Sequence, residues 1–261
     1  MHIHHVLCST TWGGAERMAC TILRLARAHG ERCTIEAPAL PEIRRGIRDE
    51  CGLTLDSTTP GPAGFGWAIQ ARARCRALAP DVVHVHLATP GLGFVGGWIA
   101  RGSGASPVVW TFHLLPARER WPNDYVLPLR SDLVLAALAR WQPRNRFVAV
   151  SAADRAQLSR RFPKQQVALA TNAPPLPPEH ADTVFSLPYP EASLRLLSVG
   201  RLQPQKGLDR LITALARPVL RALAWHWNIV GEGEQRPELE RLIQHFGLTD
   251  RVQLLGAHPA Q

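Results

Sequence analysis

Several features that would assign a protein to a class at once are missing from this sequence. Its 261 residues contain no run of about 18 apolar residues and no basic, apolar start, so we expect neither a membrane-spanning helix nor a signal peptide. The five cysteines (8, 20, 33, 51 and 75) form no Cys-x-x-Cys pair, and we expect neither a disulfide framework nor a zinc site. No Asp-x-Asp pair is present to hold a divalent cation on a diphosphate. These absences predict a cytoplasmic protein without a bound metal.

Lysine is also nearly absent. It occurs only at positions 164 and 206, so arginine carries the formal net charge of +9. Excess arginine suits anionic partners: phosphorylated small molecules, nucleic acid, or an anionic membrane surface with which the protein would make peripheral contact. A GC-rich genome produces the same composition. No basic run with interleaved aromatic residues is present, and we therefore do not expect nucleic-acid binding.

The sequence does contain an alternation of strand and helix patterns. In the first part of the chain, short apolar runs predict strands at residues 2–8, 33–37, 81–87, 108–113, 147–151 and 167–170. Helical spacing of apolar residues predicts helices at residues 15–29, 67–78, 133–140 and 152–162. A glycine-rich segment, residues 89–97, follows the third strand. Such alternation is typical of an α/β fold with a parallel, doubly wound sheet.

A proline-rich segment divides the chain. Residues 174–192 hold six prolines, a density that prevents regular strand pairing and indicates a linker. The alternation then restarts, with strands predicted at 194–199, 225–230 and 252–255 and helices at 207–216 and 234–246. Three strands are fewer than the roughly five or six of a typical open sheet. We therefore predict one domain at residues 1–173 and a second, incomplete domain at residues 193–261.

The turn after residues 194–199 combines glycine with two cations. Gly200, Arg201, Lys206 and Gly207 lie between a predicted strand and a predicted helix. At such a helix N-terminus, unpaired backbone N–H groups and fixed positive charge together favour a phosphate or diphosphate. A guanidinium can hold two phosphate oxygens, and a lysine adds a mobile point charge. We favour this function over the alternative, a solvated loop with two ordinary cations.

Two further glycine turns follow predicted strands. Gly13 and Gly14 precede the first helix, where a ligand could approach the backbone, but a plain strand-to-helix turn explains them equally well. Gly231 and Gly233 head the helix predicted at residues 234–246. Neither turn completes the G-x-G-x-x-G order of a dinucleotide site, which argues against an NAD-dependent dehydrogenase.

Histidine occurs at one strand end and at alternating positions on other strands. His113 ends the fourth strand, where it could bond a sugar hydroxyl or carry a proton, although a structural histidine is the simpler local interpretation. His84 and His86 face one side of the third strand, as His2 and His4 do on the first. A metal pair is conceivable, but no third ligand stands at a suitable spacing, so we expect buried structural pairs.

The helix predicted at residues 67–78 carries a row of arginines. Arg72, Arg74 and Arg76 occupy its polar positions. We interpret the row as a solvated helix face, with contact to an anionic membrane surface as the alternative.

Taken in order, these segments resemble the retaining glycosyltransferases of family 4, the large group 1 family with the GT-B fold. The resemblance runs from residue 2 to residue 256. It is carried by residues 13–16 (GGAE), 81–86 (DVVHVH), 111–113 (TFH), 150–151 (VS) with the following helix, Asn172, 199–202 (VGRL), 206–207 (KG), 230–233 (VGEG) and 251–256.

The resemblance implies a fold, an activity and a set of site residues. The fold would be two facing Rossmann-like domains, the first on the acceptor side and the second binding the donor, a UDP- or GDP-sugar that is substrate rather than cofactor. The activity would be metal-independent transfer of the sugar, with retention of configuration, to a hydroxyl of a saccharide or lipid-linked acceptor of the cell-surface glycan type. By resemblance, the donor diphosphate would be bound by Arg201, Lys206, Gly13 and Gly14, and His113 would be catalytic and contact the transferred sugar. The nucleotide would be bordered by Gly200, Gly231, Gly233 and Gly256. The acceptor side or the cleft would be lined by Glu16, Ser151 and Asn172.

Two departures from the family pattern matter. The family's Asn-Gly-Val-Asp near the domain junction is replaced by residues 172–175 (NAPP). The family's two glutamates seven residues apart, which hold the sugar and ribose of the donor, have no counterpart up to residue 261. We therefore expect a C-terminally truncated chain that is nearly inactive alone. The alternative is a degenerate, non-catalytic relative that binds nucleotide sugars.

Overall fold

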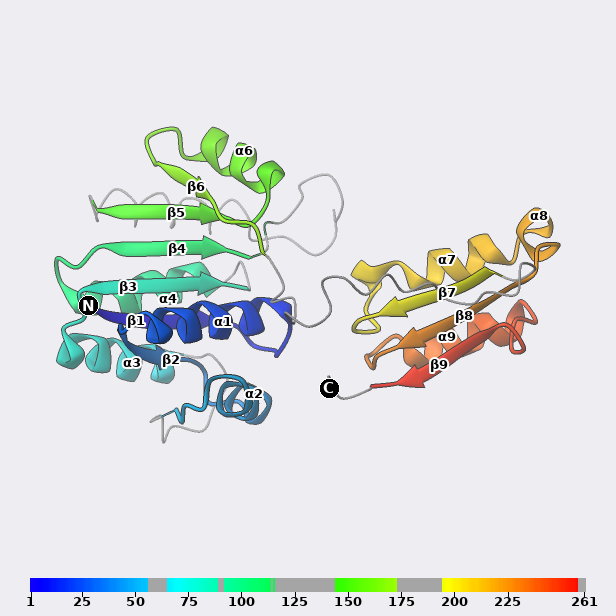
Figure 1. Cartoon of the computed structure of the whole chain (residues 1–261), viewed down its shortest axis with the longest axis horizontal. Helices are drawn as coiled ribbons and strands as arrows, with labels where there is room; N and C mark the ends of the chain where they lie inside the picture. The colour runs from blue at the N-terminus through cyan, green and yellow to red at the C-terminus, as the bar shows by residue number, and fades with distance from the viewer. Residues whose placement is uncertain (56–64, 89–91, 114, 116–143, 173–193, 258–261) are drawn as a thin grey trace. The chain divides into compact units, whose positions relative to one another are not determined.

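The computed structural model describes residues 1–55, 65–88, 92–113, 115, 144–172 and 194–257. The chain divides into two compact units, Met1–Pro175 and Leu176–Gln261, and both are built from parallel strands and helices (Figure 1). The predicted helix at residues 133–140 and the predicted linker at residues 174–192 lie outside the described residues.

The first unit contains a six-stranded parallel sheet in the order β2-β1-β3-β4-β5-β6. Its strands are β1 (His2–Cys8), β2 (Arg32–Glu36), β3 (Val82–Leu87), β4 (Val108–Phe112), β5 (Asn145–Ala149) and β6 (Val167–Leu169). Its helices are α1 (Gly14–Ala28), α2 (Pro41–Cys51), α3 (Phe65–Leu78), α4 (Gly93–Ala100), the 3-10 helix η2 (Arg101–Ser103) and α6 (Ala152–Arg161). The strand order reverses between β1 and β3, and open α/β sheets bind ligands at the carboxyl ends of strands at such a point.

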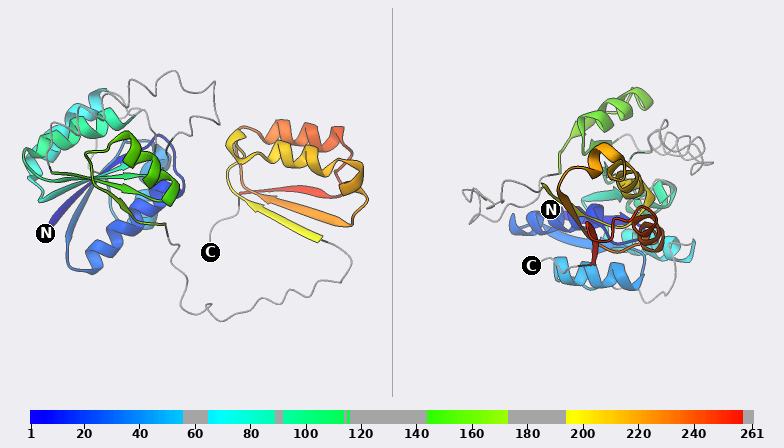
Figure 2. Two further views of the ribbon diagram at one scale, coloured as in Figure 1. Left: turned by 90° about the horizontal axis from the view of Figure 1, so that it is seen from above. Right: turned by 90° about the vertical axis from the view of Figure 1, so that its right-hand side faces the viewer.

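Helices cover both faces of this sheet. Leu7 of β1 packs with Leu23 of α1 and Ile43 of α2 in one core. Its neighbour Val6 points to the opposite face and packs in a second core with Trp110 of β4, as the alternation of side chains along a strand requires. Figures 1 and 2 show α1 and α4 on opposite sides of the sheet. The predicted parallel, doubly wound arrangement is confirmed.

Two α-helices of the first unit, α2 and α4, were not predicted from the sequence. Helix α2 has readable signals, because Pro41 begins it and Gly52 ends it in the left-handed region with φ 63°. Helix α4 forms within the glycine-rich segment. A Cβ at Gly96 would lie 2.7 Å from Cγ1 of Val85 and 2.8 Å from Sγ of Cys8. Glycine is therefore needed there for helix α4 to approach the sheet closely.

The interpretation of the arginine row as a solvated face is wrong for two of its three members. Arg74 donates to both carboxylate oxygens of Glu36 at 2.7 Å, and Trp67 Nε1 donates to the same carboxylate at 2.9 Å. Arg72 donates to the backbone oxygen of Trp98 at 2.8 Å and lies over its ring. Arg76 is exposed. Because two guanidiniums are held by contacts inside the unit, the row does not form the basic face that suggested a membrane surface.

The second unit is a three-stranded parallel sheet in the order β7-β8-β9. Its elements are β7 (Leu194–Val199), the 3-10 helix η4 (Pro204–Lys206), α7 (Leu208–Leu215), α8 (Pro218–Arg221), β8 (Trp225–Val230), α9 (Arg236–His245) and β9 (Val252–Gly256). The three predicted strands and two of these helices are confirmed. Helices α7 and α9 lie side by side on one face (Figure 2), and Ile212 of α7, Leu239 of α9 and Trp227 of β8 are fully buried between the helices and the sheet.

The opposite face of the second sheet carries exposed apolar side chains. Leu197 is 68% exposed and Val199 is 73% exposed. Among the described residues of this unit, the helices all lie on the other side of the sheet. Parallel sheets are normally covered on both faces, so this face is unusual.

The structure bears on two features that the sequence lacks, a disulfide framework and a membrane-spanning helix. All five cysteines are free thiols, and burial raises the pKa of Cys8 to about 12 and that of Cys75 to about 11, which makes both unreactive. In the described part of the chain, none of the helices has both the length and the apolar character needed to span a bilayer.

Candidate functional site

The loop between β1 and α1 presents backbone at the switch point of the first sheet. Gly13 caps α1 in an extended conformation and offers no side chain to the helix N-terminus, and a Cβ at Gly14 would meet no atom within 4 Å. Trp12 anchors the loop, because its ring lies against Gly46 of α2, where a Cβ would come within 2.2 Å. The glycines therefore leave the first N–H groups of α1 open to an anion. Glu16, in the first turn, is buried.

His113 lies just beyond β4 and belongs to a cluster of histidines. Its Nε2 is 3.2 Å from Nδ1 of His86 on β3, and Nε2 of His86 is 3.1 Å from Nδ1 of His5 on β1. His84 contacts the same cluster with its ring centroid 4.0 Å from that of His86, and its Nε2 is 2.8 Å from Oγ1 of Thr111. The expectation that His84 and His86 share one face is confirmed.

These imidazoles are neutral at physiological pH. Burial lowers the pKa of His5 to about 3 and the pKa of both His84 and His113 to about 4. The pKa of His86, which is completely buried, is also lowered well below its usual value by desolvation. Each ring therefore carries one N–H and one lone pair, so each can donate one hydrogen bond and accept another.

The expectation that no third imidazole accompanies His84 and His86 is wrong. His5 pairs with His84 in the register of β1 and β3, and one ring nitrogen from each of His5, His84 and His86 lies within 4.8 Å of the others. Three neutral imidazoles could hold an ion such as Zn²⁺. The sequence signal was present at residue 5, but only strand pairing shows that these residues are neighbours.

Two residues expected on the acceptor side have different surroundings. Ser151 caps α6: its Oγ accepts a hydrogen bond from the backbone N–H of Asp154 at 3.1 Å and donates one to Oδ2 of the same residue at 2.6 Å. This structural role accounts for a serine at that position. Asn172 is exposed beyond the end of β6.

The second unit brings the glycine turn and its two cations to one pocket. A cavity of about 170 Å³ at the carboxyl end of β7 is lined by residues that include Gly200, Arg201 and Lys206. The side chain of Lys206 folds back over Gly200, because a Cβ there would lie 3.9 Å from Nζ. Gly207, with φ 65°, is the N-cap of α7. The predicted combination of helix N-terminus and two cations is therefore present as a single surface.

The other glycines of this unit are needed for packing between backbones. A Cβ at Gly231 would lie 1.9 Å from the backbone oxygen of Gly200, and one at Gly233 would lie 2.3 Å from that of Leu202. The N–H of Gly231 donates to the backbone oxygen of Gly256 at 2.8 Å. The turns after β7, β8 and β9 are thus stacked on one another, and close packing explains these glycines whether or not a nucleotide lies beside them.

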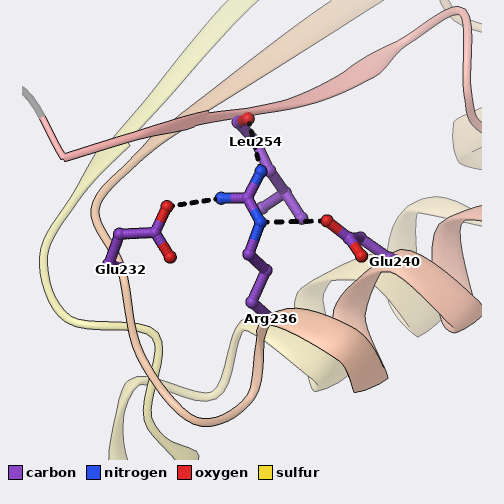
Figure 3. Close-up of polar contacts among 4 residues, drawn as sticks. All are labelled: Glu232, Arg236, Glu240 and Leu254. Carbon is purple, nitrogen blue, oxygen red and sulfur yellow. Dashed lines mark hydrogen bonds and ion pairs between the residues drawn. The ribbon is translucent and has the colours of Figure 1, made fainter.

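Arg236 supports the glycine turn after β8, a role that sequence reasoning missed. Figure 3 shows its guanidinium between three acceptors: Glu232 in the glycine turn at 2.8 Å, Glu240 on α9 at 3.0 Å and the backbone oxygen of Leu254 on β9 at 3.3 Å. It ties the turn to the helix and to the neighbouring strand. The spacing of four residues on either side of Arg236 is a readable signal for such ion pairs.

Comparison with known families identifies both units. The family model described as Glycosyltransferase Family 4 matches residues 12–173. The model described as Glycosyl transferases group 1 matches residues 181–261. The first of these alone covers more than half of the chain.

Individual proteins similar to this chain are glycosyltransferases as well. The chain is 26% identical over 273 residues to 2-deoxystreptamine glucosyltransferase from Streptomyces kanamyceticus, an alignment that covers 93% of this chain and 70% of the relative. It is 31% identical over 198 residues to D-inositol 3-phosphate glycosyltransferase from Mycolicibacterium smegmatis, covering 67% of this chain and 42% of that one.

Among solved structures, Anabaena HepE in complex with UDP and glucose matches with a TM-score of 0.71 and 19% identity over 99% of this chain and 70% of that chain. This likeness shows the GT-B fold. Together with the family matches, it establishes that this chain belongs to the family 4 glycosyltransferases of group 1 and is a transferase enzyme.

Proposed function

We propose that this glycosyltransferase moves a sugar from a UDP- or GDP-sugar to a hydroxyl of a saccharide or lipid-linked acceptor, with retention of configuration and without a metal ion. The observation that carries the proposal is the pocket at the start of α7, where Arg201 and the ammonium of Lys206 lie beside the backbone of Gly200. Two cations at a helix N-terminus fit a diphosphate.

The chemistry that these residues can supply is stabilisation of the leaving group. As the bond from the sugar to the diphosphate breaks, negative charge builds up on the departing oxygens. A guanidinium and an ammonium already in place stabilise that charge without rearranging, which is the role that a metal ion has in other transferases. The absence of an Asp-x-Asp pair from the sequence is consistent with this assignment.

The first unit supplies the remaining proposed parts. The open N-terminus of α1 at Gly14 would accept a second anionic or hydroxyl group of the ligands, and His113 would bond the transferred sugar. In the retaining reaction implied by the family resemblance, the acceptor hydroxyl attacks the same face that the diphosphate leaves, with a leaving phosphate oxygen as the base. The presence of UDP and glucose in the HepE structure supports a sugar nucleotide as donor, and the name of the Streptomyces kanamyceticus relative, 2-deoxystreptamine glucosyltransferase, supports sugar transfer.

A donor screen tests the proposal. The full chain is incubated with UDP- and GDP-sugars, and free UDP or GDP is measured with and without acceptors such as aminocyclitols, inositol phosphate and glycolipids. Because the 261 residues are expected to be nearly inactive alone, we expect binding of at least one donor with only slow release of nucleotide. Both should be reduced by Lys206→Ala and unaffected by Lys164→Ala, the matched variant at the other, exposed lysine. Binding of nucleotide sugars with neither transfer nor hydrolysis would instead support the non-catalytic alternative.

A further inference from the structure

The backbone that carries Arg201 is hydrogen-bonded to the β8–α9 turn, which comprises residues 231–235. Leu202, the residue after Arg201, is fully buried and donates its N–H to the backbone oxygen of Glu232 at 2.9 Å. Its own backbone oxygen accepts the N–H of Gln235 at 3.1 Å. The residue next to Arg201 is therefore tied to the β8–α9 turn at two points.

The other neighbour of Arg201 is held as well. Gly200 donates its N–H to the backbone oxygen of Val230, the last residue of β8, at 2.9 Å. Arg201 itself is exposed and lines the pocket proposed for the diphosphate, whereas Leu202 packs in the core of the second unit. The place from which the guanidinium of Arg201 can reach a ligand is therefore set by contacts with the end of β8 and the β8–α9 turn.

The β8–α9 turn is built mainly from residues that cannot fix it by packing. Gly231 and Gly233 have no side chains, and Glu232 and Glu234 are exposed. Glycine has more backbone freedom than other residues, so such a turn keeps one conformation only where other contacts restrain it. A larger residue cannot replace Gly233, because its Cβ would lie 2.3 Å from the backbone oxygen of Leu202.

Arg236 supplies a restraint from outside the turn. Its guanidinium donates to Glu232 at 2.8 Å, to Glu240 on α9 at 3.0 Å and to the backbone oxygen of Leu254 on β9 at 3.3 Å (Figure 3). Acceptors on a turn, a helix and a strand fix the orientation of this planar group. The side chain of Arg236 is 32% exposed, and ion pairs with solvent access add little to global stability. Its main effect is therefore on the local geometry of the turn.

We propose that Arg236 is a positioning residue that holds Arg201 in place for the diphosphate of the donor, acting through the β8–α9 turn and the backbone of Leu202. The role of the diphosphate rests on the function proposed above, whereas the connection from Arg236 to Leu202 does not. A guanidinium that is already in position binds phosphate oxygens without a further cost of ordering.

A double-mutant cycle tests whether Arg236 acts through Arg201. The probes are pyrophosphate, which contains only the diphosphate, and UDP, each titrated into the full chain by calorimetry. We expect Arg236→Gln to raise the Kd for both probes about three- to tenfold. When Arg201 is already replaced by alanine, the same change should alter the Kd less than about twofold, because residues that act together are not additive.

Arg241→Gln is the matched control on the same helix. Arg241 is exposed and forms an ion pair with Glu238 on α9, away from the β8–α9 turn. We expect its replacement to leave the Kd for pyrophosphate and UDP unchanged. Arg236→Lys keeps the positive charge but cannot reach three acceptors at once, so we expect a Kd between those of the wild type and Arg236→Gln.

Amide hydrogen exchange tests the connection without a ligand. In Arg236→Gln we expect the N–H of Leu202 to exchange about tenfold faster than in the wild type, because the turn that accepts it opens more often. In Arg241→Gln its rate should not change. The measurement reports on local opening, so it separates loss of position at the Arg201 turn from a general loss of stability.

Several outcomes would overturn the proposal. One is an effect of Arg236→Gln on pyrophosphate affinity that is the same with and without Arg201, and another is a Leu202 amide whose exchange rate does not change. A loss of stability with unchanged affinity would leave Arg236 only a structural role. Should Arg236→Gln fail to fold, Arg236→Lys takes its place in the cycle. A wild-type chain that binds neither probe would count against the proposed diphosphate site, while the exchange of Leu202 would still judge the connection.

Discussion

His5 and His86 are 81 residues apart in the sequence, yet Nδ1 of His5 lies 3.1 Å from Nε2 of His86 in the interior of the first sheet. Their strands are adjacent and parallel, and His5 is opposite His84 in the register. A shift of the register by one residue would turn the side chains of one strand to the other face. The histidine cluster is therefore a consequence of strand pairing.

Replacement of Lys206 should weaken binding of nucleoside diphosphates. A charge-assisted contact to phosphate is worth about 1.5–3 kcal/mol, so Lys206→Ala and Arg201→Ala should each raise the Kd for UDP or GDP about 10- to 150-fold. Titration calorimetry measures this. Lys164→Ala, at an exposed lysine of the first unit, is the control. Equal affinity in all three variants would remove the basis for the proposed diphosphate site.

Two glycine-to-alanine changes should affect different properties: Gly231→Ala the stability of the second unit, and Gly14→Ala the binding of a ligand. Gly231→Ala places a Cβ 1.9 Å from the backbone oxygen of Gly200 at φ 143°, and we expect it to destabilise the second unit by about 2–3 kcal/mol. Gly14→Ala meets no atom within 4 Å, so stability should change by less than about 1 kcal/mol. Its methyl group should nevertheless hinder a ligand at α1. Urea unfolding and donor turnover separate the two effects, and a stable Gly231→Ala protein would contradict the packing argument.

Two arginines on α3 should differ sharply in importance. Arg74→Ala leaves the carboxylate of Glu36, which is 5% exposed, without its bidentate partner. Because the Arg74 side chain is itself 28% exposed, we expect a loss of about 2–3 kcal/mol, below the range for a fully buried ion pair. Arg76→Ala, two residues away on the same helix, removes an exposed side chain and should change the free energy of unfolding by less than about 0.5 kcal/mol. Chemical denaturation measures the free energy of unfolding of both variants. Similar losses from the two variants would show that the pair with Glu36 contributes little.

Stability should fall as the solution is acidified from neutral pH. The pKa of His4, His84 and His113 is lowered to about 4 and that of His5 to about 3, from an ordinary value of about 6.5. Between about pH 4 and pH 6.5 the unfolded chain therefore binds protons that the native protein does not. The free energy of unfolding is therefore highest above pH 6.5 and falls below it, by up to about 1.4 kcal/mol per pH unit for each histidine.

Urea titrations at several pH values between about 5 and 7 measure this slope. His4→Leu should reduce this slope by the equivalent of about one proton, because the ring of His4 is buried with one unpartnered nitrogen. His29→Leu, at an exposed histidine that follows α1, is the control variant. A slope that His4→Leu does not reduce would show that this ring is protonated equally in both states.

Much of the fold could be predicted because its signals are local. The run of residues 2–8 is strand β1 as predicted, and the spacing of apolar residues after Gly207 predicted α7 within one residue of its start. Side-chain alternation and the 3.6-residue period depend on neighbours in the sequence, so a single chain reveals them. Helix α4 was not predicted because glycine normally disfavours a helix, whereas here Gly96 allows the helix to pack on the sheet.

By itself the sequence determined the α/β class, the parallel sheets, the order of the family motifs and the pairing of Arg201 and Lys206 with a glycine turn. The tertiary structure alone decided which side chains meet. It placed His5 with His84 and His86, paired Arg74 with Glu36, and stacked Gly231 on Gly200. The physical reason is that such contacts depend on strand register and on the close approach of distant backbones. Neither is encoded in the pattern of any one segment.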